Sequence, residues 1–64
     1  MEITLVETKE VAKVEIKVEK TFEYYVAGRR RTYTLQAAPE FWEDGDVAMH
    51  LVESAIRRMW AAEI

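Results

Sequence analysis

The fold is decided by residues 12–26, AKVEIKVEKTFEYYV, in which apolar and polar residues alternate almost without interruption. The even positions are apolar apart from Lys20, and the odd positions are mostly charged. A period of two is typical of a β-strand that buries one face and leaves the other in water. At about 3.3 Å per residue this strand would span roughly 50 Å, too long for a straight strand in so short a chain. We therefore predict a bend at Lys20 and Thr21.

The segment before this strand predicts a first pairing. Residues 3–7 are apolar enough to form a short strand, and we expect it to pair with residues 11–19. The turn of this hairpin is then predicted at residues 8–10, Thr-Lys-Glu.

The segment after the strand predicts a second hairpin, because alternation resumes with its phase shifted. A two-residue loop at 27–28 places Phe22 opposite Tyr33, whereas a four-residue loop at 27–30 places Tyr24 opposite Tyr33. Both loops keep the apolar faces together. We expect the four-residue loop, because it pairs apolar with apolar residues more often.

The C-terminal part of the chain predicts helix. Residues 39–44 begin with a proline, which lacks the N–H needed in a sheet and favours a first helical turn. This turn is expected to bury Phe41 or Trp42. Asp46 is then predicted to be the N-cap of a helix over residues 47–63.

The predicted helix has an unusually wide apolar face. One arc of the helical wheel holds Leu51, Ala62, Ala55, Ala48, Met59 and Val52, and the opposite side holds His50, Arg57, Ser54 and Glu53. Met49, Ile56 and Trp60 lie at one shoulder and widen the apolar arc to about half the circumference. We expect either that Trp60 covers the sheet edge or that Met49, Ile56 and Trp60 form a homodimer face.

Together these elements predict an α+β fold: a three-stranded antiparallel β-meander with one C-terminal α-helix packed on one face, in the order β-β-β-α. Residues 1–64 contain no repeat or linker, so we expect one domain.

Composition narrows the class of protein. The chain has 64 residues, 9 Lys plus Arg, 12 Asp plus Glu and no cysteine. Disulfides and thiolate metal clusters are therefore excluded, and self-association is the cheapest further source of stability for so small a core. The N-terminal residues show neither a basic segment nor a long apolar stretch, so we expect a cytoplasmic protein without a membrane span.

The residues needed for catalysis or cofactor binding do not occur in recognisable patterns. Gly28 and Gly45 stand alone, so no phosphate-binding loop is predicted. His50 and Glu53 are three residues apart, but we interpret them as a solvated surface pair rather than a metal site. We expect no enzyme activity, no cofactor and no metal.

The net charge of −3 is unevenly distributed. Arg29, Arg30 and Arg31 form a basic hairpin tip beside three tyrosines, a combination that can hold phosphates and stack bases or contact an acidic partner. Because the whole chain lacks a basic footprint, direct nucleic-acid binding is the alternative rather than the main expectation. Carboxylates of the sheet and of residues 40–46, with two aromatic anchors, form the expected partner-binding set: Glu15, Glu19, Glu23, Tyr25, Glu40, Trp42, Glu43, Asp44 and Asp46.

Two resemblances bear on function. The strand residues Tyr24, Tyr25, Val26 and Ala27, followed by a helix that begins Asp46, Val47, Ala48, are similar to antitoxin domains of the partial RNase-H-like kind over the second half of the chain. The segment between sheet and helix departs from their Pro- and Gly-containing loop, so no functional residue is carried over.

In class alone, a short, acidic, cysteine-free chain without catalytic residues resembles the small anti-CRISPR inhibitors of phages and mobile elements. That resemblance implies binding to the nucleic-acid-handling surface of a host protein complex. We therefore expect a non-enzymatic inhibitor that uses its acidic and aromatic residues. The alternatives are a nucleic-acid-binding module, an antitoxin-like partner domain, or a structural or designed fold.

Overall fold

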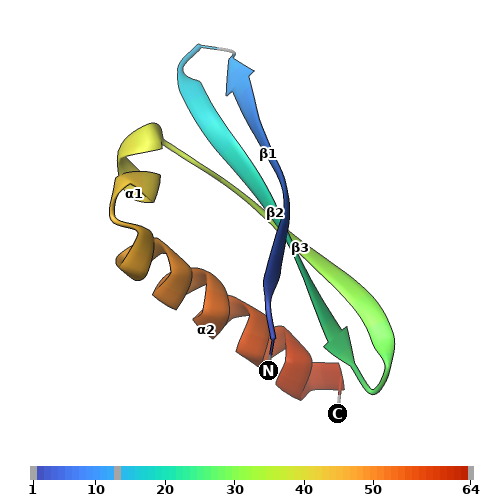
Figure 1. Ribbon diagram of the computed structural model, residues 1–64. Coiled ribbons are helices and arrows are strands. Elements are labelled where there is room, and N and C mark those ends of the chain that lie inside the picture. The colour runs from blue at the N-terminus through green and yellow to red at the C-terminus, as the bar shows by residue number, and fades with distance from the viewer. Residues whose placement is uncertain (1, 13, 64) are drawn as a thin grey trace.

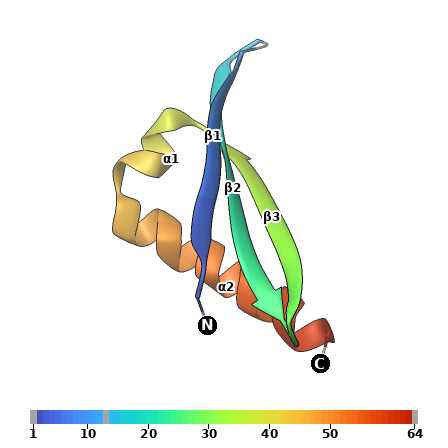
Figure 2. The same ribbon diagram turned by 45° about the vertical axis from the view of Figure 1, so that its right-hand side comes forward.

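The computed structural model describes residues 2–12 and 14–63. Its elements are β1 (Thr4–Ala12), β2 (Ile16–Val26), β3 (Arg29–Ala37), α1 (Pro39–Glu43) and α2 (Gly45–Glu63). The strands form one antiparallel sheet in the order β1-β2-β3, and α2 lies across one face of it (Figures 1 and 2). The predicted α+β arrangement is confirmed.

The buried face of β2 is the one that the alternation predicts. Phe22, Tyr24 and Val26 are buried against α2, where Val52 and Ile56 are fully buried. Partly buried residues from β3, α1, α2 and the segment just before β1 pack around this core: Ile3, Tyr33, Leu35, Trp42 and Met59.

The pairing of β1 differs from the prediction. Residues 8–10 do not form a turn but lie inside β1, and the chain reverses between Ala12 and Ile16. Residues 3–7 therefore lie beside the C-terminal half of β2, with Leu5 opposite Phe22. Neither candidate turn contains the Gly, Asn, Asp or Pro that would specify it, so register is set by burial beside α2.

The pairing of β1 with β2 is irregular next to the position where a bend of β2 is predicted. β2 is one continuous strand through Lys20 and Thr21. The register shifts between Leu5 and Glu7, so that Val6 is an extra residue opposite this part of β2. Such a bulge increases local twist and hinders pairing of an edge strand with another chain.

The hairpin between β2 and β3 has the two-residue loop, so the prediction of a four-residue loop is wrong. Phe22 pairs with Tyr33, and Arg29 and Arg30 belong to β3. Ala27 and Gly28 both have positive φ, 50° and 78°. Two successive positive φ angles define the turn whose twist matches that of paired strands, and this match favours the shorter loop.

The helical segment begins with the predicted proline-led turn, α1. Trp42 is its anchor: the indole N–H donates to the Val18 carbonyl at 2.9 Å, and the ring lies 6.4 Å from that of Phe22.

The N-cap of α2 is Asp44 rather than Asp46. Its Oδ1 accepts the Val47 N–H at 3.2 Å, and its carbonyl accepts the Ala48 N–H at 3.0 Å. A cap must directly precede the first helical residue, which is Gly45, so Asp46 lies inside the first turn. In the part of the chain that the structure describes, no helix is long and apolar enough to cross a membrane.

Candidate protein-binding site

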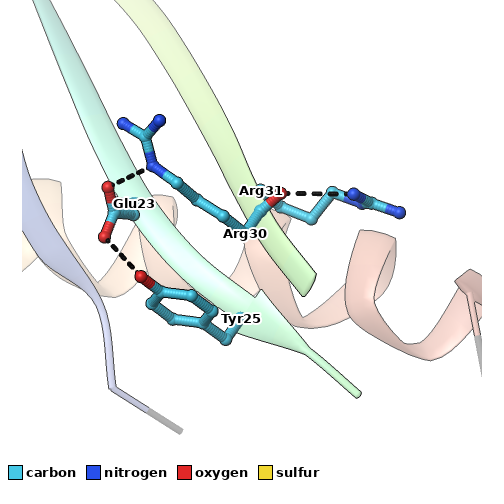
Figure 3. A network of polar contacts seen from close by, with 4 residues as sticks. All are labelled: Glu23, Tyr25, Arg30 and Arg31. Atoms are coloured by element: carbon cyan, nitrogen blue, oxygen red, sulfur yellow. Dashed lines mark hydrogen bonds and ion pairs between the residues drawn. The ribbon is translucent and has the colours of Figure 1, made fainter. Parts of the chain in front are cut away.

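The sheet carboxylate Glu23 is occupied by its own neighbours. One oxygen accepts the Arg30 Nε–H at 2.5 Å, and the other accepts the Tyr25 hydroxyl at 3.2 Å (Figure 3). The hydrogen bond from Arg30 holds the pKa of Glu23 below its ordinary value. The negative charge of Glu23 is therefore already balanced within the fold by Arg30.

Glu19 is compensated in the same way. It accepts the Gln36 amide N–H at 2.8 Å and lies 3.3 Å from the Lys9 ammonium. The hydrogen bond from Gln36, with the attraction of Lys9, lowers the pKa of Glu19. The outer sheet face is thus a set of satisfied cross-strand pairs, while Glu15 lies apart from it in the turn between β1 and β2.

The three arginines of the hairpin do not form one basic surface. Arg30 lies on the outer face with Glu23, whereas Arg31 lies on the inner face and contacts Glu63 of α2 at 2.7 Å. Figure 3 shows the two side chains leaving β3 in opposite directions. The period of two that builds the strand places Arg30 on the face opposite that of Arg29 and Arg31.

The acidic segment, Glu40, Glu43, Asp44 and Asp46, surrounds the junction of α1 and α2 and is exposed. Among the residues that the structure describes, none of these four carboxylates forms an ion pair. Trp42 does not accompany them as a free anchor, because it is half-buried and stacks against the core. The Lys20 ammonium lies 4.9 Å from the centre of its ring.

The predicted homodimer face is wrong in one member. Ile56 is fully buried, because α2 directs residues 48, 52 and 56 at the sheet, four residues apart. Met49 and Trp60 remain on the flank, 39% and 37% exposed. Leu51, expected in the apolar arc, is 49% exposed, so the buried stripe is rotated toward the shoulder residues.

His50 and Glu53 do not form a site together. Glu53 accepts two N–H bonds from Arg57, at 3.0 and 2.5 Å, one helical turn further on. No cluster of three His, Cys, Asp or Glu side chains suited to a metal ion occurs within residues 2–12 and 14–63.

A groove of about 610 Å³ brings together two residues that belong to different predicted sets. It lies between the end of β2 and the C-terminal half of α2, and its walls are Glu2, Tyr25, Ala27, Arg57, Trp60 and Ala61. Tyr25 is 55% exposed here. The sequence identifies Tyr25 and Trp60 separately. Arg57 joins them through the path of α2 over the sheet, and Glu2 through the pairing of β1 with the end of β2.

Comparison of the chain with protein-family models, with curated proteins and with solved structures finds no match.

Proposed function

We propose that this chain is a small non-enzymatic protein-binding domain, and that its partner docks in the groove between Tyr25 and Trp60. The groove supports this proposal because it combines a tyrosine, a tryptophan and an arginine on one concave surface. These are the residue types that contribute most to binding energy at protein interfaces. Both rings expose apolar area that the fold does not use, while Tyr25 keeps its hydroxyl bonded to Glu23.

In its finer form, the proposal is an inhibitor of the anti-CRISPR type that binds a basic, nucleic-acid-handling surface of a host complex. The acidic segment at the α1–α2 junction supports a basic partner, because its carboxylates have no ion-pair partner among the described residues. Exposed unpaired charges chiefly accelerate association with a surface of opposite sign. The acidic segment then steers the partner, and the aromatic groove holds it.

The inhibitor proposal is tested by phage plating on a panel of bacterial strains that carry different CRISPR–Cas systems. Expression of the chain should restore plating on at least one strain, and the purified chain should bind the effector complex of that strain. If the chain restores plating on no strain of the panel, the inhibitor proposal is refuted.

The groove is tested with Tyr25→Ser combined with Trp60→Ser. This double variant should weaken binding by roughly 100-fold or more, because two hot-spot side chains are removed. Val14→Ser is the matched control, since Val14 is a fully exposed apolar residue outside the groove. Equal binding by the double variant and the control would place the site elsewhere.

The steering role is tested with Glu40→Gln combined with Glu43→Gln, and with Glu7→Gln combined with Glu10→Gln as a control of equal charge change. Only the first pair should slow association and flatten its dependence on salt concentration. The dissociation rate should change little in either double variant. Equal association rates for the two pairs would remove the acidic segment from the proposal.

A further inference from the structure

The edge of β3 is open and regular. β3 pairs with β2 over nine residues without a register shift, whereas the other edge strand, β1, carries the bulge at Val6. In antiparallel sheets an edge strand without a bulge or proline is a template for another strand. The β3 edge is therefore the side of this sheet best suited to pairing.

The two-residue loop identifies the main-chain groups that face this edge. The pair that closes such a loop, Val26 with Arg29, exchanges hydrogen bonds, and bonded and unbonded pairs then alternate along the ladder. The main-chain groups of Arg30, Thr32, Thr34 and Gln36 therefore point away from β2. In agreement, the Arg30 carbonyl is free to accept the Arg31 Nη1–H at 3.2 Å.

The flank of α2 beside this edge is apolar and exposed. Met49 lines a second groove, of about 230 Å³, with Ile3 and Leu5 near β1, so the Met49–Trp60 flank faces the β1 side. The opposite flank must face the β3 side. It carries Val47 and Leu51, which are 52% and 49% exposed.

This flank is self-complementary. Its residues recur every three or four positions: Asp44, Val47, Leu51, Ala55 and Arg58. When two copies run antiparallel about Leu51, each Val47 meets Ala55 of the partner subunit. Each Asp44 then meets Arg58 of the partner subunit. The centre of such a pair is apolar, and its two ends carry opposite charges.

We propose that a second copy of this chain docks on the β3 edge. The two β3 strands pair antiparallel about Tyr33 and form a continuous six-stranded sheet, with the two α2 helices side by side on one face. Thr32 then lies opposite Thr34 of the partner subunit.

One two-fold axis satisfies both layers of this dimer. Tyr33 pairs with Phe22, which packs in the same cluster as Val52, and Leu51 precedes Val52 on the flank of α2 opposite Met49. Each three-stranded half is about 14 Å wide, and a helix with its side chains is roughly 10–12 Å across. Two helices therefore fit above the joined sheet, and each leans toward the two-fold axis so that their separation closes from about 14 Å to the 8–10 Å of packed helices.

This inference does not depend on the proposed function. The groove of Tyr25 and Trp60 lies on the opposite flank of α2, so this groove stays open in each subunit of the dimer. The dimer would present two identical binding sites and gain avidity toward a repetitive partner.

The first test is the solution mass by sedimentation equilibrium, from micromolar to millimolar chain concentration. The wild type should reach twice the monomer mass of 7.5 kDa. Leu51→Asp should weaken the dimer by at least roughly 100-fold, because two carboxylates then face each other. Val14→Asp, on an apolar side chain that is fully exposed and lies far from α2 in the turn between β1 and β2, should leave the dimer intact. A monomeric wild type, or a Leu51→Asp variant that dimerises normally, would overturn the proposal.

The strand register is tested with charges at Thr32 and Thr34. Lysine at both positions places like charges opposite each other and should dissociate the dimer, whereas Thr32→Lys with Thr34→Glu should preserve it. Thr4→Lys on the β1 edge is the matched control and should have no effect. Dissociation of the Lys–Glu variant, with circular dichroism showing a folded chain, would contradict the Tyr33-centred pairing.

A third test detects the dimer by crosslinking and uses no substitution that weakens it. The chain has no cysteine, so Leu51→Cys should form a disulfide-linked dimer under mild oxidation, since position 51 meets itself across the axis. Val14→Cys should remain largely uncrosslinked at the same concentration. Equal crosslinking of the two variants would refute docking through α2.

Discussion

Replacing Ile56 by Val is the sharpest test of how α2 is rotated over the sheet. A surface position at the shoulder of the helix would tolerate this change, whereas Ile56 is fully buried in the cluster of Phe22, Tyr24, Val26 and Val52. The substitution removes one methylene group and keeps the branching at Cβ. It therefore changes packing with little effect on helix propensity.

The expected magnitude follows from burial. Ile→Val in a core costs about 0.5–1.5 kcal/mol, and Ile→Ala costs about 2–5 kcal/mol. A chain of 64 residues has a free energy of unfolding of roughly 3–10 kcal/mol. Since 1 kcal/mol corresponds to about 4–8 °C in a domain of this size, Ile56→Val should lower Tm by about 2–12 °C. Ile56→Ala should remove a large part of the free energy of unfolding and leave a substantial unfolded population at 25 °C.

The assay is urea and thermal unfolding followed by circular dichroism in dilute solution, where self-association contributes least. Val14→Ala is the control, because its side chain is fully exposed and should change stability by less than about 0.5 kcal/mol. An Ile56→Val variant as stable as this control would refute the rotation of α2 and return Ile56 to the surface.

Four further substitutions test local features by the same unfolding measurements. Ala27→Asn should stabilise the fold by about 0.5–1 kcal/mol, because Asn tolerates the positive φ of 50° better than Ala. Gly45→Ala should stabilise it by about 0.4–1 kcal/mol, since an added Cβ meets no atom within 4 Å. Asp44→Ala should destabilise it by about 1 kcal/mol through loss of the N-cap. The hydrogen bond from Arg30 lowers the pKa of Glu23, so the ionised pair stabilises the fold at pH values above the ordinary carboxyl pKa. This stabilisation is lost as the pH falls through the lowered pKa. Glu23→Gln should therefore flatten the acid limb of the stability profile, and an unchanged limb would contradict the pairing.

Much of the fold is predictable because β2 carries a period of two in which only Lys20 breaks the run of apolar residues. Phe22, Tyr24 and Val26 cannot all be buried unless one face of the strand meets another layer, and the helical period after Pro39 supplies that layer. The α+β order follows from these two patterns alone.

Register and loop length were not predictable, because no residue in the chain specifies them locally. The turn before β2 lacks a strong turn residue. The turn after it places Ala27 in a conformation that Asn or Gly would adopt more readily. Pairing is instead decided by long-range burial beside α2, which no local pattern contains.

The rotation of α2 was ambiguous for a different reason. Its apolar arc spans about half the circumference, so the wheel placed Leu51 within the arc and Ile56 only at its shoulder. The candidate site could not be predicted for the same reason. Trp60 and Tyr25 line one groove only when the buried stripe of α2 runs through Ala48, Val52 and Ile56. Aromatic residues were therefore identifiable as candidates, but not as neighbours.

The width of the apolar arc has one physical consequence that links both proposals. A buried stripe through Val52 and Ile56 leaves apolar side chains on each flank of α2, with Trp60 toward β1 and Leu51 toward β3. Because the two flanks lie on opposite sides of one helix, a change at Leu51 should dissociate the dimer without touching the groove. A change at Tyr25 and Trp60 should abolish partner binding without altering the dimer, apart from the lost avidity. If one substitution disrupts both, the two surfaces are a single interface and the rotation of α2 argued above is wrong.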